Sequence, residues 1–157
     1  MLLTLFIIAL LLAALTAWFL IPAASIARRL LGEGTLAGSC LPSLARWAAL
    51  IEEALGETKE KHPFMFYGTD WVGFAHLVMA IACLGAARDP VRNMWVLQFG
   101  MVGCSLMIPM TLITGIARGL PWFWQLFDCI IGAAGAVLFL TCYRYARQME
   151  ILTAPGS

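Results

Sequence analysis

MWVLQFGMVGCSLMIPMTLITGIA, residues 94–117, is followed after three residues by PWFWQLFDCIIGAAGAVLFLTCY, residues 121–143. Two more runs of the same apolar character lie upstream, over residues 2–21 and 69–87. The hydrocarbon core of a bilayer is about 30 Å thick, so a helix of about 20 apolar residues crosses it. Each of the four runs is about that long. The sequence therefore predicts an integral membrane protein with four transmembrane helices.

The composition agrees with a membrane location. Of the 157 residues, 62% are hydrophobic and only 12% are charged, whereas soluble domains carry about 25% charged residues. The formal net charge is +1 and no basic run is present, so the chain lacks the features of a nucleic-acid-binding protein. The first run is long for a signal peptide and no Lys or Arg precedes it, which favours an uncleaved span; cleavage near Ser25-Ile26-Ala27 is the alternative. We expect one transmembrane domain over residues 1–157, with disorder only in the last five residues.

The connections between the runs predict how the helices pack. Spans two, three and four are joined by the tight turns Arg88–Asn93 and Arg118–Leu120, and such short turns make consecutive helices antiparallel neighbours. The long first connection, residues 22–68, has apolar residues at helical spacing over about residues 42–56, with Gly56 at the end. The predicted fold is an antiparallel four-helix transmembrane bundle with an amphipathic helix in the long first loop. This helix lies across the end of the bundle or against a partner.

Alternation of the spans places the N-terminus, the Arg88–Asn93 turn and the C-terminal tail on one face of the membrane. Two arginines lie in this turn and two in the tail, and basic residues in short segments face the cytoplasm. We therefore predict that this face is cytoplasmic, in the cell membrane or inner membrane. Arg28 and Arg29, soon after the first span, argue for the opposite orientation.

Two ionisable residues lie inside apolar runs, where such side chains are costly and are functional candidates. Thr69 and Pro121 start two predicted spans that begin from the same membrane face. His76 is seven positions after Thr69, and Asp128 is seven positions after Pro121. At about 1.5 Å per residue, both side chains lie about 10 Å inside that face, so we expect them within hydrogen-bond or one-water reach. The pair has two interpretations: a hydrogen bond that only fixes helix register, or a proton-responsive or ligand-binding site.

Asp70 and Arg118 are further polar candidates near the same membrane boundary. Thr69 is expected to cap the second span, with Asp70 as a first-turn acid favoured by the helix dipole. Arg118 ends the third span and is a candidate partner for Asp70. The aromatic residues of this face are typical of interfacial anchors, with a ligand cage as the alternative. The expected lining residues of a pocket at the intramembrane pair are Trp71, Trp122, Phe123 and Met107.

The sequence predicts no metal site, cofactor or disulfide. Met101, Cys104 and Met107 place soft donors at helical spacing in the third span, but core packing explains these residue types more readily than copper does. The five cysteines are odd in number and four lie in spans, which argues against a disulfide framework. His76 is the only intramembrane histidine, which excludes haem ligation by two histidines within the bundle.

Two hypotheses about function, from different classes, stay open. The first is a non-enzymatic accessory or self-associating membrane subunit, with the lipid bilayer and a membrane protein or a second copy as partners. Its support is the small residues Gly132 and Ala136 in the fourth span and Gly100 and Cys104 in the third, which permit close helix approach. The second is a small-molecule or lipid binder, a proton-coupled carrier or an isomerase-like membrane enzyme that uses the intramembrane pair. A cavity at the pair would favour the second hypothesis.

Overall fold

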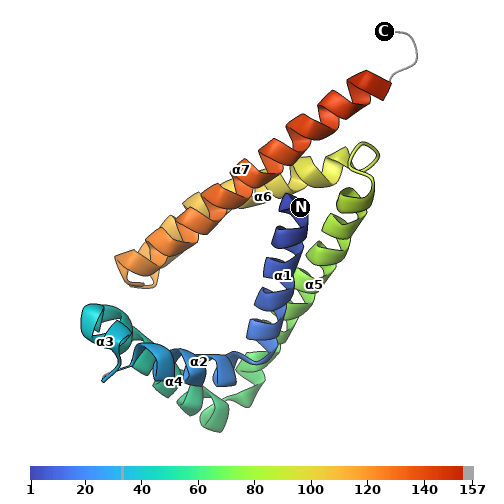
Figure 1. Ribbon diagram of the computed structural model, residues 1–157. Coiled ribbons are helices and arrows are strands. Elements are labelled where there is room, and N and C mark those ends of the chain that lie inside the picture. The colour runs from blue at the N-terminus through green and yellow to red at the C-terminus, as the bar shows by residue number, and fades with distance from the viewer. Residues whose placement is uncertain (33, 154–157) are drawn as a thin grey trace. The chain divides into compact units, whose positions relative to one another are not determined.

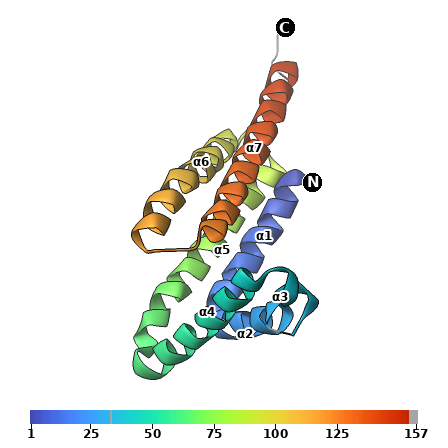
Figure 2. The same cartoon turned by 90° about the vertical axis from the view of Figure 1, so that its left-hand side faces the viewer.

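The computed structural model describes residues 1–32 and 34–153, and these residues form helices and turns without a β-strand (Figure 1 and Figure 2). The elements are, in chain order, α1 (Leu2–Trp18), α2 (Leu20–Leu31), α3 (Leu36–Cys40), α4 (Pro42–Lys61), the 3₁₀ turn η1 (Pro63–Met65), α5 (Phe66–Arg88), α6 (Met94–Ala117) and α7 (Trp122–Thr153). Contacts divide the chain into two compact units. The hairpin unit is Met1–Ala9 with the chain from Met79 onward, and the bend unit is Leu10–Val78. A single domain stays a prediction, and the tail after residue 153 lies outside the described residues.

The described helices are compatible with the multi-pass membrane protein that the sequence predicts. Three are long and apolar enough to cross a membrane: Pro63–Arg88, which joins η1 to α5, then Met94–Ala117 and Trp122–Leu152. Helices α1 and α2 together also qualify, but they are bent by 101°. The described chain thus holds three such helices, or four if the bent pair is one span. The antiparallel packing of four such helices in one bundle stays a prediction.

The bend between α1 and α2 departs from the straight helix expected over residues 2–21. Phe19, between the two helices, has φ −110° and ψ 40°, outside the helical region. Pro22 explains the break, because a continuous helix needs a hydrogen bond from residue 22 to the carbonyl of Trp18. Proline has no N–H, and its ring collides with the carbonyl four residues earlier. In the first turn of α2 this N–H has no helical partner anyway, so Pro22 is tolerated there.

In the hairpin unit, α6 and α7 run antiparallel along each other (Figure 1 and Figure 2). Gly119 adopts a φ of 66° in the turn between them, a conformation that favours glycine. The N–H of Leu120 donates to the carbonyl of Gly115 over 2.9 Å and closes the end of α6. Helix α6 has the bounds of the third apolar run, Met94–Ala117.

Small residues let α6 and α7 approach closely. Phe139 is only 1% exposed and packs on Gly100, where a Cβ would overlap its ring. Gly132 and Gly135 lie against Cys104, and a Cβ at Gly135 would come within 2.7 Å of the Cys104 sulfur. These small residues are therefore used for packing inside the chain.

In the bend unit, α2 and α4 pack together (Figure 2). Helix α4 buries Ala45 and Ala48, and the Arg28 guanidinium of α2 donates to a carboxylate oxygen of Glu52 over 2.6 Å. This hydrogen bond, followed by a second one from Ser25, holds the pKa of Glu52 below its ordinary value of 4.5. A charge pair therefore joins α2 to α4.

Helix α4 is longer than the sequence predicts, because it continues beyond Gly56 to Lys61. No positive φ is needed at Gly56, so its conformational freedom does not end the helix. Pro63 sets the end instead, since proline cannot continue a helix and disfavours helical backbone in the residue before it, His62.

Candidate functional site

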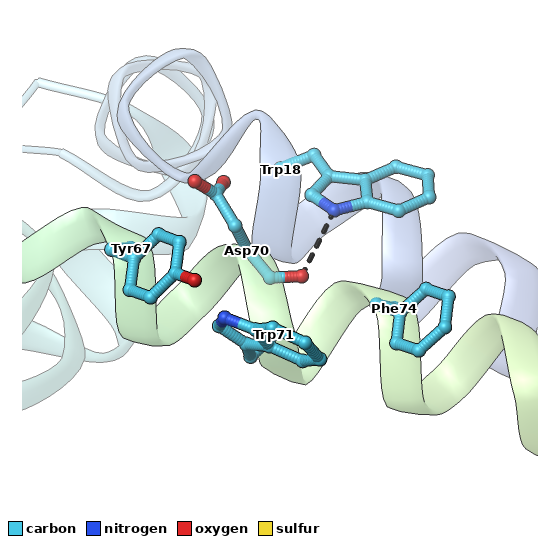
Figure 3. A pocket seen from close by; sticks show the side chains of 5 residues that line it. All are labelled: Trp18, Tyr67, Asp70, Trp71 and Phe74. Carbon is cyan, nitrogen blue, oxygen red and sulfur yellow. Dashed lines mark hydrogen bonds between the residues drawn. The ribbon is translucent and has the colours of Figure 1, made fainter.

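An aromatic pocket lies in the bend unit, where the end of α1 meets the start of α5 (Figure 3). It has a volume of about 350 Å³ and is lined by Trp18, Tyr67, Asp70, Trp71 and Phe74. The three aromatic residues of α5 are spaced i, i+4, i+7 and share one helix face. Neighbouring rings meet edge to face, with centroids 6.1 Å apart for Tyr67–Trp71 and 5.7 Å for Trp71–Phe74. The pocket is thus a row of aromatic rings with one acid among them.

The polar edge of Trp18 holds its ring in place. The indole N–H donates to the backbone carbonyl of Asp70 over 3.1 Å (Figure 3). Gly73 permits this approach, because a Cβ there would lie 2.6 Å from the indole nitrogen. Since its N–H is already bonded, Trp18 offers a ligand only the faces and apolar edges of its ring.

Asp70 does not have the first-turn position that the sequence predicts. Helix α5 begins at Phe66, directly after η1, and the hydroxyl of Thr69 donates to the Phe66 carbonyl over 2.7 Å instead of capping a helix. The Asp70 side chain is exposed and points away from the Trp18 hydrogen bond (Figure 3). Among the described residues of the bend unit, none makes a hydrogen bond or ion pair with its carboxylate.

His76 and Asp128 belong to different units, and their pairing stays a prediction. His76 is half-buried in α5, and its Nδ1 lies 2.7 Å from the carbonyl oxygen of Val72. A carbonyl oxygen only accepts, so Nδ1 carries the proton and Nε2 is the accepting nitrogen of the neutral ring. Asp128 is half-buried in α7, and no described residue of the hairpin unit makes a hydrogen bond or ion pair with its carboxylate.

The other predicted site residues lie at separate places. Trp71 lines the aromatic pocket, whereas Met107 lines a groove of about 540 Å³ on α6 in the hairpin unit. Trp122 and Phe123 lie at the start of α7, with ring centroids 6.2 Å apart, and line neither of these two pockets. Arg118 is exposed in the turn after α6, and its pairing with the acid of the other unit stays a prediction.

Sequence reasoning missed Trp18 and Phe74, and it interpreted Tyr67 as an interfacial anchor with a ligand cage as the alternative. The signal for the α5 part of the pocket is the i, i+4, i+7 spacing of Tyr67, Trp71 and Phe74. The contact of Trp18 with Asp70 joins residues 52 positions apart and has no local signal.

The described residues offer little for metal chemistry. Over residues 1–32 and 34–153, no group of three or more His, Cys, Asp or Glu side chains has the geometry to hold a metal ion. The five cysteines are free thiols.

Comparisons with protein-family models, with curated proteins and with solved structures found no match for this chain. Function is therefore inferred from the geometry of the chain's own residues.

Proposed function

We propose that the protein is a non-enzymatic, self-associating subunit of a membrane, built as an antiparallel bundle of four spans in one domain. Within the bent α1–α2 pair, α1 contributes the first span, and α5, α6 and α7 contribute the others. The packed α2 and α4 lie along the membrane surface, where the exposed apolar residues of α2 contact lipid. The exposed apolar residues of α2 are Ile26 and Leu30, and Phe19 at the bend is exposed as well.

The observation that carries the proposal is the outer face of α6. Six large apolar side chains at helical spacing form a stripe along this face, and each is more than half exposed: Trp95, Phe99, Val102, Leu106, Met110 and Ile113. Gly103 lies within the stripe, and a Cβ there would meet no described atom within 4 Å. The groove that contains Met107 begins at this glycine. We define Gly103 and these six residues as the α6 outer face.

A second copy of the chain suits this face. The small residues that the sequence suggested for association, Gly100 and Gly132, are used inside the α6–α7 hairpin, which leaves Gly103 as the open glycine of α6. A helix with a glycine groove matches the same groove on another copy, because two such helices approach closely around a two-fold axis. Lipid chains adapt to any apolar surface, whereas only a protein helix gains from this particular shape.

A non-enzymatic role is favoured by the position of the ionisable residues. Neither the aromatic pocket nor the α6 groove includes His76 or Asp128. A packed polar pair fits the role of fixing helix register better than that of binding a substrate.

For orientation, we propose that the Arg88–Asn93 turn and the C-terminus face the cytoplasm at the cell membrane or inner membrane, supported by their four arginines.

A second candidate function, a small-molecule or lipid binder that uses the intramembrane pair, is favoured by one observation. His76 Nδ1 already bonds to the Val72 carbonyl, so Nε2 is the nitrogen that faces any further partner. Binding that uses this nitrogen should weaken in the variant His76→Gln, and unaltered binding in the variant would rule the role out.

The test of self-association is energy transfer between donor- and acceptor-labelled copies of the full chain in liposomes. Wild type should show transfer that depends on protein-to-lipid ratio. Gly103→Leu places a side chain in the groove at a position where a Cβ meets no described atom within 4 Å, so it should weaken association about tenfold or more while the helix content stays unchanged. Gly68→Leu is the matched control, because a Cβ at this α5 glycine also meets no described atom within 4 Å. Equal transfer in wild type and Gly103→Leu would refute the proposal.

A further inference from the structure

We infer that the aromatic pocket binds a quaternary ammonium group, carried either by a lipid headgroup or by a free solute. The inference rests on the five residues of the pocket within the bend unit and is independent of self-association through α6.

The rings of the pocket are available to a ligand. Their side chains are between 41% and 65% exposed, from Trp18 at the low end to Tyr67 at the high end. Adjacent ring planes on α5 are nearly perpendicular, at 85° for Tyr67–Trp71 and 87° for Trp71–Phe74. A ligand in the pocket therefore meets both faces and edges of rings. The faces attract cations, because the ring quadrupole is negative there.

The negative charge of the pocket also favours a cationic ligand. Asp70 lines the pocket, and among the described residues of the bend unit its carboxylate has no hydrogen-bond or ion-pair partner. The Trp18 hydrogen bond leaves it free, because that bond goes to the backbone carbonyl. A cation seated over the rings would therefore also be attracted by the negative charge of Asp70.

The scarcity of hydrogen-bond acceptors favours a quaternary over a primary ammonium. A primary ammonium brings three N–H donors that each need an acceptor. The lining side chains offer only the Asp70 carboxylate and the Tyr67 hydroxyl, since the indole nitrogens of Trp18 and Trp71 are donors. A tetraalkylated nitrogen has no N–H group and buries its methyl groups against the rings.

The pocket lies where α1 ends and α5 begins, at the start of a membrane-length helix. The ends of membrane-spanning helices lie at the depth of the lipid headgroups, where Trp and Tyr are enriched. A choline headgroup of phosphatidylcholine is thus one source of the ligand, and a small water-soluble quaternary amine is the other.

The test is isothermal titration of tetramethylammonium chloride into the full-length protein, held in nanodiscs of phosphatidylglycerol, which contains no choline. Empty nanodiscs correct for the attraction of cations to the anionic lipid, and ammonium chloride at equal concentration tests selectivity. Asp70→Asn keeps the backbone carbonyl that Trp18 uses and removes the charge, and Trp71→Leu removes a central ring. Trp122→Leu is the matched control, because Trp122 is an exposed indole outside the pocket.

Wild type should bind tetramethylammonium saturably, with no saturable binding of ammonium. Asp70→Asn and Trp71→Leu should each weaken binding about fivefold or more, and Trp122→Leu should not change it. Exchange of the lipid for phosphatidylcholine then separates the sources: weaker apparent binding identifies the headgroup as the occupant, and unchanged binding identifies a free solute. Absence of saturable binding by wild type, or full binding by an Asp70→Asn variant of unchanged helix content, would overturn the inference.

Discussion

Gly100→Ala and Gly103→Ala should differ in their effect on stability, although the two glycines lie three residues apart on α6. Either substitution removes a helix glycine, which favours the folded helix by about 1 kcal/mol. At Gly103 the added methyl group meets no described atom within 4 Å, so this gain should be the whole effect. At Gly100 the methyl group would lie 2.6 Å from Cε2 of Phe139.

The Phe139 ring cannot yield to this methyl group. It is 1% exposed, and the ring of Phe6 also packs against it, at a centroid distance of 4.7 Å and an interplanar angle of 76°. Overpacking of such a site costs about 1–3 kcal/mol. The Gly100→Ala protein should therefore be less stable than the Gly103→Ala protein by about 1–3 kcal/mol.

The measurement is reversible unfolding in mixed micelles with increasing fractions of dodecyl sulfate, followed by far-ultraviolet circular dichroism. A double-mutant cycle with Phe139→Leu supplies the control, because the shorter side chain removes the ring atoms that meet the new methyl group. The penalty of Gly100→Ala should then shrink. Equal stability of the two alanine variants, or a penalty that survives Phe139→Leu, would refute the packing of α6 on α7 described above.

Three further predictions address the bend unit and the intramembrane pair. Because the pKa of Glu52 is lower in the folded protein than in the unfolded chain, its charge stabilises the α2–α4 contact above the unfolded pKa, and this contribution is lost as pH falls through the folded value. Hydrogen exchange of α2 should therefore be faster in Glu52→Gln than in wild type at pH 7, by a difference that shrinks as pH falls below 4.5. Trp18→Phe should lower the free energy of unfolding by about 0.5–1.5 kcal/mol, since it keeps a ring and removes the donor to Asp70, and an unchanged value would contradict that hydrogen bond. His76→Gln and Asp128→Asn should be non-additive by at least about 0.5 kcal/mol in a double-mutant cycle, whereas additive effects would show that the two side chains do not interact.

The presence of long apolar helices was predictable because a bilayer leaves few alternatives, but only the third run has the predicted bounds. The third apolar run coincides with α6, since Asn93 and Arg118 bound it. Pro109 lies inside this helix, and α6 accommodates it without a break. The bend at Phe19 had a signal in Pro22, but that signal has the same form as the proline that α6 accommodates. The presence of a proline alone does not distinguish a broken helix from a continuous one.

The facing of the helices was not predictable from the sequence. A membrane helix is apolar on all sides, so periodicity does not say which face is packed. Gly100 and Gly103 look equivalent in the sequence, yet one lies under Phe139 and the other is open. The same limit applies to the candidate site, because the directions of the His76 and Asp128 side chains depend on helix rotation. Their equal depth stays a prediction that counts seven residues from Thr69, whereas α5 begins three residues earlier, at Phe66. The aromatic pocket additionally needs the Trp18–Asp70 contact, which depends on how the chain turns at Phe19.

The most direct measurement for the central claim is native mass spectrometry of the untagged protein, ejected from nanodiscs formed directly from its own membrane. Wild type should appear as a homo-oligomer, and Gly103→Leu should appear as a monomer at the same expression level. A wild-type protein that is monomeric throughout, with or without a bound small molecule, would contradict self-association through the α6 outer face.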